Sequence, residues 1–421
     1  MPRTFGLIDG NSFYCSCERA FAPRLRGRAV VVLSNNDGCA VARTAEARTV
    51  VRMGDPWHLA RRRPEVRAAR IEWLSSNYEL YGDMSRRMYM VLAELVPRVE
   101  PYSINEMFLD MDTCRDAADL ARDLRHAVRR IAKIPTCVGL GPTKTIAKLA
   151  NAAAKADPAL DGVCDLRDER DRLRLYERTS VDEVWGICSR TADKLQALGI
   201  TTVARFIAMP GREARSLLTV VGARVQAELQ GVSCLPLSLV LPARKGLAVT
   251  RCFGRPVTRW VEMREACAHH ASRAGEKLRA GGLVAGRMAV FLHTDPHGGG
   301  PWYSGQRAGR IEPTDDAGAL IGEALRMLAP LWRDGHRYMK VGVMLDDLRD
   351  KATQPRSLFP SRDPVRSAVL MRAMDQVNSR YGRGTLRPLA TGIARPWGTR
   401  AGRLTPRHTT HPGEIMQARA L

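Results

Sequence analysis

Two acidic residues in short apolar segments have the types and spacing that a metal site requires. Glu106 follows Asn105 inside the segment 102–110, where apolar residues surround this polar pair. Asp9 ends the apolar stretch 4–8 near the N-terminus. Carboxylates that separate strands deliver to one sheet are suited to hold divalent metal ions. The alternative is that Asp9 and Glu106 are solvated turn residues, and spacing alone does not decide between these interpretations.

The elements that must position the two acids are short strands. Residues 99–103 and 107–111 have the pattern of strands joined at Asn105 and Glu106, which predicts a β-hairpin with the acid at its bend. Residues 4–9 predict a further strand that carries the second acid. We therefore expect both carboxylates on one sheet.

The surrounding pattern predicts an α+β sheet layered with helices. Further strands are expected at 29–33 and 136–140, and helices at 11–21, 40–53, 84–95, 116–132 and 142–155. The insert at about 28–80 would be a small module attached to the sheet.

From about residue 165 the chain changes to short helices. Gly186-Ile187-Cys188 precedes a helix expected at 189–197, and a weaker copy of this pattern lies at 220–223. A glycine turn between short helices can offer backbone N–H groups to a phosphate.

The last part of the chain predicts a linker, a domain and a tail. Residues 231–246 are rich in Leu and Pro, and residues 247–348 alternate strands with helices as a further α+β domain. Residues 352–421 contain twelve Arg against three acids, with many Pro, Gly and Thr. We expect this tail to lack a large core and to be partly disordered.

The charge of the chain is strongly positive. Lys and Arg number 66 against 44 Asp and Glu, a formal net charge of +22. Such an excess favours a polyanionic partner, most simply nucleic acid. The alternative is a coding bias toward Arg, which explains Arg over Lys but not the net excess.

Composition also bears on the cellular compartment. No apolar run approaches the roughly 20 residues that a membrane helix needs, and the N-terminus lacks a signal-peptide pattern. Ten Cys occur without CxxC pairs. We expect a cytoplasmic protein with no disulfide framework, no zinc site and no membrane partner.

Several motifs in a fixed order carry a resemblance to a known family. They lie at residues 8–14, 34–39, 53–57, 75–81, 102–110, 141–145, 181–186, 335–338 and 382–386. On these motifs the chain resembles the Y-family translesion DNA polymerases. Among them it is most similar to the UmuC type, the catalytic subunit of DNA polymerase V.

The resemblance implies an α+β multidomain fold of the right-hand type. Its parts would be a ferredoxin-like palm, small fingers, a helical thumb with helix-hairpin-helix motifs, and an α+β little finger. The implied boundaries are palm 1–27 and 81–165, fingers 28–80, thumb 166–230, linker 231–246, little finger 247–350 and basic C-terminal tail 351–421.

The resemblance also implies error-prone translesion DNA synthesis, a template-directed nucleotidyl transfer past damaged bases in DNA repair and SOS mutagenesis. Catalysis of phosphoryl transfer is mostly positioning and charge neutralisation. Two Mg²⁺ ions, or Mn²⁺, would be held by Asp9, the backbone carbonyl of Gly10, Glu106 and, more weakly, Asn105. Two metals about 3.5–4 Å apart clamp the attacking and leaving oxygens.

Nucleotide and DNA contacts follow from the same resemblance. Tyr14 matches the steric gate that excludes a ribose 2′-OH, and Arg48 and Lys155 match the cations that hold the triphosphate. Gly186-Ile187-Cys188 would contact DNA. Without the resemblance, Tyr14 would be an aromatic packed next to Phe13, and each cation would lie on a solvated helix face.

The implied partners are primer-template DNA, deoxynucleoside triphosphates, a sliding clamp, a UmuD-like dimer and a recombinase filament. A clamp-binding peptide would comprise Gln354, Leu358 and Phe359, with a Gln-to-Leu spacing one residue longer than the common five-residue form. The alternative is a hydrophobic anchor in a loose tail.

Two positions depart from the family pattern. The family has a metal-ligand Asp where this chain has Asn105, and the amide keeps one oxygen ligand but loses a full charge. Asp110 is a poor substitute, because five extended residues span about 16 Å. The family usually has Gly at Cys188, where a positive φ would strain any other residue.

Two hypotheses therefore follow from the sequence. The first is a translesion DNA polymerase, active or impaired by Asn105. The alternative is a catalytically inactive DNA-binding accessory protein on the polymerase fold.

Overall fold

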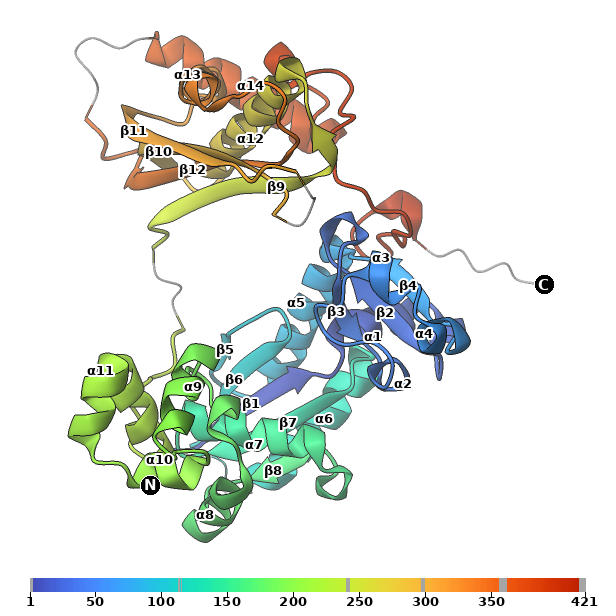
Figure 1. Ribbon diagram of the computed structural model, residues 1–421, viewed down its shortest axis with the longest axis vertical. Coiled ribbons are helices and arrows are strands. Elements are labelled where there is room, and N and C mark those ends of the chain that lie inside the picture. Colours follow the sequence, from blue (N-terminus) through green and yellow to red (C-terminus); the bar gives the residue numbers. More distant parts are fainter. Residues whose placement is uncertain are drawn as a thin grey trace. The chain divides into compact units, whose positions relative to one another are not determined.

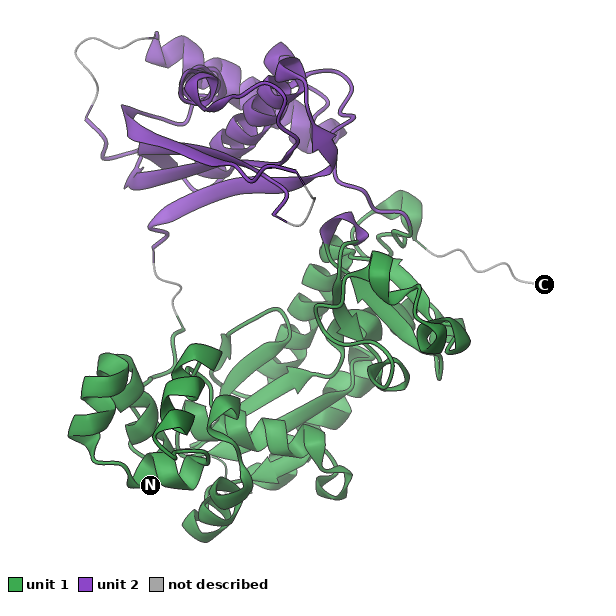
Figure 2. Cartoon of the chain, in the orientation of Figure 1, with its two compact units in different colours: residues 1–34, 38–241, 403–421 green, residues 35–37, 242–402 purple. Residues whose placement is uncertain are grey.

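The computed structural model describes residues 3–112, 114, 116–239, 243–296, 300–355 and 362–415. The protein is a mixed α+β, multidomain chain, as the sequence predicts. It divides into two compact units (Figure 2). The first unit comprises residues 1–34, 38–241 and 403–421, and the second comprises residues 35–37 and 242–402.

A five-stranded sheet is the centre of the first unit (Figure 1). Its strand order is β5-β6-β1-β7-β8, so β1 lies in the middle. β1 is antiparallel to both β6 and β7, and β7 is parallel to β8. The strands are β1 (Phe5–Gly10), β5 (Val99–Pro101), β6 (Glu106–Asp110), β7 (Thr136–Gly141) and β8 (Val163–Asp165). The predicted hairpin is present as β5 and β6.

Side chains of β1 and β6 alternate between the two faces of this sheet. Ile8 lies opposite Met107, and both belong to the core beneath α1, α5 and α6. Leu7 lies opposite Phe108, and both pack with Ala147 of α7. Because strand side chains alternate with a period of two, the next pair, Asp9 and Glu106, shares the α7 face.

The described part of the first unit has seven α-helices of nine or more residues. They are α1 (Phe13–Phe21), α5 (Tyr78–Leu95), α6 (Ala117–Ile131), α7 (Lys144–Ala156), α8 (Glu169–Arg178), α9 (Ser189–Ala197) and α11 (Gly211–Leu229). The expected helix 84–95 begins earlier, at Tyr78, because the Asn77 side chain caps α5 by accepting from the Leu80 N–H.

The helix α7 is fixed tightly on β1 and β7. A Cβ at Gly139 would lie 2.1 Å from the backbone nitrogen of Asn151, so only glycine permits this approach. The Asn151 amide donates to the carbonyls of Leu7 (3.1 Å) and Cys137 (2.7 Å). This attachment sets the height of α7 over the face that carries the acids.

A three-stranded sheet forms a separate module between α1 and α5. Its order is β3-β2-β4, and short helices flank it. The elements are β2 (Val30–Leu33), β3 (Ala40–Arg43), α2 (Ala45–Arg48), α3 (Trp57–Ala60), α4 (Pro64–Ala68) and β4 (Glu72–Ser75). The expected helix 40–53 is wrong for Ala40–Arg43, because Ala40 and Ala42 pair with β2 and bury their methyl groups there. Within that range only the short helix α2 is helical. Alanine suits either structure, so pairing with a buried strand decides the outcome.

The second unit contains an antiparallel four-stranded sheet in the order β11-β10-β12-β9. Helices α12 and α13 contribute apolar side chains to one core with this sheet. The elements are β9 (Gly246–Val257), α12 (Trp260–Ala280), β10 (Leu283–Thr294), β11 (Ser304–Thr314), α13 (Ala317–Leu328) and β12 (Tyr338–Asp350).

Residues 362–415 of the tail have a defined structure, so the expectation of partial disorder is wrong for these residues. Helix α14 (Pro364–Tyr381) buries Met371 and Met374 against Ala317. Trp397 belongs to the core of the second unit, and residues 403–415 pack in the first unit. In its described residues the tail has no large core of its own, and its buried apolar residues, Met371, Met374 and Trp397, pack with residues from outside the tail.

Candidate active site

The two acids predicted from the sequence meet at the ends of β1 and β6. Asp9 lies directly opposite Glu106 in the strand register, and the Gly10 N–H donates to the Asn105 carbonyl (2.8 Å). Directly opposed residues have Cβ atoms about 4.5–5.5 Å apart. Asp9 is only 5% exposed. The pair is therefore a built feature of the sheet rather than two solvated turn residues.

Asn105 joins the two acids into one cluster. Its amide nitrogen donates to Asp9 Oδ1 (3.1 Å), and its amide oxygen accepts from the Ser103 hydroxyl (3.2 Å). Ser103 also lies 3.3 Å from Glu106 Oε2 and accepts from the backbone N–H of Glu106 (3.2 Å). The hairpin bend is thus held by hydrogen bonds that the acids and the amide share.

Two lysines of α7 neutralise the acids. Lys155 Nζ lies 2.5 Å from Asp9 Oδ2, and Lys148 Nζ lies 2.7 Å from Glu106 Oε1. The lysines are seven residues apart and so lie on one face of the helix. Burial raises the pKa of the Asp9 carboxyl, and the Lys155 ammonium opposes that rise.

Lys148 is a site residue that the sequence analysis missed. Its ammonium lies 4.7 Å from the ring centre of Tyr102 and 5.6 Å from that of Trp185. The Trp185 indole donates to the Tyr102 hydroxyl (3.1 Å), which ties the segment before α9 to the hairpin. The seven-residue spacing from Lys155 in the predicted helix was the signal that could have found it.

The oxygen donors in this cluster fit a hard divalent cation. Two carboxylates, of Asp9 and Glu106, and the Asn105 amide oxygen are ligands of the kind that Mg²⁺ and Mn²⁺ accept. Among the described residues, no group of three or more His, Cys, Asp or Glu could hold a metal. In this cluster Asp9 and Glu106 are the two acids and residue 105 is an amide, so the cluster is one acid short of such a group. Two carboxylates balance one dication but not two.

Tyr14 and Arg48 lie near the start of α1. The Tyr14 ring is half-buried and stacks on Tyr81, with ring centres 4.5 Å apart and an interplanar angle of 15°. Arg48 Nη2 donates to the hydroxyl of Ser12, the residue before α1 (3.3 Å). Burial raises the pKa of Tyr14. Strand β1 leads directly from Asp9 into this turn, so the chain itself keeps these residues close to the acids.

The candidate phosphate-binding turn lies before α9. Gly186 has φ +92°, Ile187 is buried, and Cys188 is exposed at the N-terminal cap of α9. Cys188 has φ −82°, so the strain considered for a residue other than glycine does not arise. The weaker copy at 220–223 lies inside α11, which Thr219 interrupts with φ 66°.

The candidate clamp-binding residues are only partly described. The Gln354 amide oxygen accepts from Arg349 (3.4 Å). Leu358 and Phe359 lie outside the described residues.

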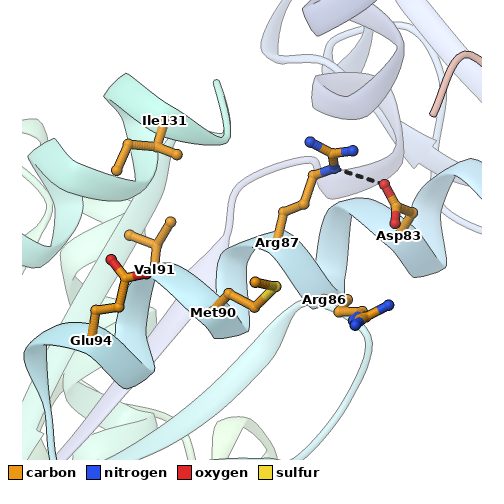
Figure 3. Close-up of a pocket in the computed structure, with 7 residues that line it drawn as sticks. All are labelled: Asp83, Arg86, Arg87, Met90, Val91, Glu94 and Ile131. Atoms are coloured by element: carbon orange, nitrogen blue, oxygen red, sulfur yellow. Dashed lines mark hydrogen bonds and ion pairs between the residues drawn. The ribbon is translucent and has the colours of Figure 1, made fainter.

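A separate pocket of about 430 Å³ lies between α5 and α6 (Figure 3). Its lining residues are Asp83, Arg86, Arg87, Met90, Val91, Glu94 and Ile131. Arg87 pairs with Asp83 across one turn of α5 (2.7 Å). No residue of the acid cluster lines this pocket.

Among the described residues, no helix is long and apolar enough to cross a membrane.

Comparisons with known proteins agree with the resemblance. Residues 8–152 match the impB/mucB/samB family, and residues 244–358 match the C-terminal domain of that family. Residues 368–418 match a domain of unknown function, DUF4113.

Relatives cover nearly the whole chain. Protein UmuC of Salmonella typhimurium is 40% identical over 99% of this chain and 100% of its own length. Protein SamB of Salmonella typhimurium is 40% identical over 99% of each chain. DNA polymerase IV of Moorella thermoacetica is 28% identical over 89% of this chain and 93% of its own length.

Proposed function

Because the chain belongs to the impB/mucB/samB family, we propose that it is a DNA-directed DNA polymerase that performs error-prone translesion synthesis. The observation that carries this proposal is the register of β1 and β6, which sets Asp9 opposite Glu106 on one buried sheet. Relatives named DNA polymerase IV support the same activity. Its substrates are DNA and deoxynucleoside triphosphates.

The parts of a right-hand polymerase would be distributed as follows. The five-stranded sheet with its helices would be the palm, from residues 1–27 and 81–165, and the three-stranded module would be the fingers, from residues 28–80. Residues 166–230 would be the thumb and residues 247–350 the little finger. The linker would be residues 231–246.

A divalent metal ion, Mg²⁺ or Mn²⁺, would be held by Asp9, Glu106, the Gly10 carbonyl and the Asn105 amide oxygen. Such an ion would supply positive charge to the phosphate oxygens of the nucleotide. The lysines of α7 have a complementary role, because they pair with the two acids. An incoming triphosphate would compete with the carboxylates for Lys155 and Lys148 and would free both acids for metal binding.

Tyr14 and Arg48 would complete the nucleotide site. Arg48 belongs to α2, and its hydrogen bond to Ser12 holds its side chain at the start of α1. It would bind the triphosphate together with Lys155. The stacked ring of Tyr14 would act as the steric gate against a ribose 2′-OH. Three aromatic rings, those of Phe13, Tyr78 and Tyr81, contact the Tyr14 ring. A steric gate needs such support, because a side chain that moves easily would not exclude a small hydroxyl.

The DNA contacts would come from the turn before α9 and from the general positive charge. The backbone at Gly186, Ile187 and Cys188 would bind a phosphate of the primer-template. A sliding clamp would bind Gln354, Leu358 and Phe359. A UmuD-like dimer and a recombinase filament would be further partners.

Primer extension tests the proposed function directly. The full chain should extend a primer on an undamaged template and across an abasic site with Mg²⁺ or Mn²⁺. Glu106→Gln should abolish extension, because it removes one of two carboxylates, while Glu94→Gln on the exposed face of α5 should leave it unchanged. Extension that survives Glu106→Gln would show that this cluster is not the active site.

The accessory-protein alternative makes the opposite prediction. A protein of that kind binds primer-template DNA but extends no primer, either as it is or as Asn105→Asp. The polymerase names of the relatives favour the enzyme over this alternative.

A further inference from the structure

Residues 403–415, here called the C-terminal clip, pack on β4 and the start of α5. The backbone of Arg403 pairs with Ser75 at the end of β4, since the Ser75 N–H donates to the Arg403 carbonyl (3.0 Å). The Arg403 N–H donates to the Ser75 hydroxyl (3.0 Å). The Arg403 guanidinium lies 4.7 Å from the ring centre of Trp73 and 3.7 Å from Glu72. The clip therefore begins as an extension of the three-stranded module.

Asn77 holds Thr405 and Pro406 of the clip. Its side chain is 2% exposed, and its oxygen caps α5 while its nitrogen faces the clip. That nitrogen lies within hydrogen-bond distance of three acceptors: the Thr405 carbonyl (3.0 Å), the Thr405 hydroxyl (3.1 Å) and the Pro406 carbonyl (3.2 Å). A cap residue that serves a second segment in this way fixes that segment relative to the helix.

A buried carboxyl group, that of Glu18, connects the clip to α1. Glu18 of α1 is 2% exposed, and burial raises its pKa. Its Oε1 accepts two hydroxyl hydrogens, one from Tyr81 (2.7 Å) and one from Thr405 (3.1 Å). Burying a carboxyl is costly unless hydrogen bonds compensate. An apolar residue at position 18 would pack without that cost, so the carboxyl serves to connect these two hydroxyls.

Tyr81 carries the connection to Tyr14. The Tyr81 ring is fully buried and stacks on the Tyr14 ring. Tyr78 meets both rings edge-on, at 5.9 Å from Tyr14 and 6.2 Å from Tyr81. The hydrogen bond from Tyr81 to Glu18 fixes the Tyr81 ring, and the stacked contact transmits that position to Tyr14. A continuous set of contacts thus runs from Thr405 through Glu18 and Tyr81 to Tyr14.

We propose that the C-terminal clip positions Tyr14 through Glu18 and Tyr81, and so sets how strictly the protein excludes ribonucleotides. The inference rests on the proposed role of Tyr14 as steric gate. It gives a role to part of the matched domain of unknown function, residues 368–418, which includes the described clip. Thr405, Glu18 and Tyr81 are positioning residues, because they act on the nucleotide only through Tyr14.

The test compares insertion of a deoxynucleotide and the matching ribonucleotide by the full chain. The readout is the kcat/KM for the deoxynucleotide divided by the kcat/KM for the ribonucleotide. It is measured in the Asn105→Asp background if the unaltered chain is slow. Thr405→Val should lower this ratio about fivefold, the factor that one hydrogen bond of typical strength is worth. Thr405→Ser restores the hydroxyl and should restore the ratio. Thr410→Val, at an exposed position of the clip, is the matched control and should leave the ratio unchanged.

Two further measurements separate the clip from the gate. Tyr14→Ala should lower the ratio more than Thr405→Val does, and adding Thr405→Val to Tyr14→Ala should have no further effect. In a chain labelled with fluorotyrosine, the ¹⁹F signal that Tyr14→Phe removes should shift with Thr405→Val and not with Thr410→Val.

The outcomes that overturn the proposal are distinct. If Tyr14→Ala lowers the ratio but Thr405→Val leaves both the ratio and the Tyr14 signal unchanged, the clip does not position Tyr14. If Tyr14→Ala leaves the ratio unchanged, Tyr14 is not the gate, and the proposed role of Tyr14 fails together with the inference. If Thr405→Ser fails to restore the ratio, the hydroxyl is not the connecting group.

Discussion

Replacing Asn105 by Asp should raise polymerase activity by restoring a third carboxylate. The Asn105 amide now donates to Asp9 over 3.1 Å, in a cluster whose two acids are matched by two lysines. The cluster therefore offers little net negative charge to a metal. Asn105→Asp removes the amide donor, adds one negative charge and keeps nearly the same shape.

The size of the effect follows from the short distances in the cluster. Two unit charges about 4 Å apart interact by about 4 kcal/mol at an effective dielectric constant of about 20. A dication would thus gain about 8 kcal/mol from the new carboxylate. Before metal binds, a proton or a lysine neutralises the repulsion between the new carboxylate and Asp9. The metal must displace that proton or lysine, which offsets about 4 kcal/mol of the gain. The remaining 4 kcal/mol or so corresponds to about a thousandfold in metal affinity.

Single-turnover insertion of one nucleotide across a range of Mg²⁺ concentrations measures this effect. At low Mg²⁺ the Asn105→Asp variant should react up to about a thousand times faster, with the difference shrinking as metal saturates the original chain. Gln306→Glu adds one negative charge at an exposed position of β11 and controls for the change in net charge. Equal rates and equal half-saturating Mg²⁺ for both chains would refute the reasoning.

Three other predictions concern the lysines, the second unit and the net charge. Lys155→Met should raise the KM for the nucleotide roughly tenfold or more, because it removes a charged hydrogen bond; an unchanged KM would count against a triphosphate role. Burial lowers the pKa of His270 to about 3, whereas the unfolded chain takes up that proton near pH 6.5, so stability is lost as the pH falls below 6.5. At pH 5.5 the loss is about 1.4 kcal/mol, and His270→Leu should remove it from denaturant unfolding measured at pH 7.5 and 5.5; an unaltered pH dependence would contradict this. Affinity for primer-template DNA should fall steeply with salt if the +22 charge binds phosphates, and a flat salt dependence would argue otherwise.

The strands that carry the acids could be predicted because their pattern is local. A short apolar run adjoins the acid in both β1 and β6, so Asp9 and Glu106 were assigned to strands from sequence alone. Their direct opposition is a matter of register, and it required the structure. Lys148 lay in a helix that was also predicted, but its role becomes visible only when α7 is known to cover the face with the acids.

The contacts that could not be predicted join residues far apart in the chain. Thr405 and Glu18 are 387 positions apart, and Asn77 and Thr405 are 328 apart. An Arg-rich segment with few apolar residues has the composition of a disordered tail, because it buries too little surface to fold alone. Residues 403–415 are ordered here because polar side chains of the first unit present matching donors and acceptors. The strand at Ala40–Arg43 was missed for a similar reason, since only its partner β2 distinguishes it from a helix.

The central proposal is that Asp9, Asn105 and Glu106 form a divalent-metal site. Electron paramagnetic resonance of Mn²⁺ added to the full chain with primer-template DNA and a deoxynucleoside triphosphate measures this without relying on turnover. We predict Mn²⁺ binding that Asp9→Asn abolishes and Asn105→Asp strengthens. Mn²⁺ binding that neither substitution changes would contradict it.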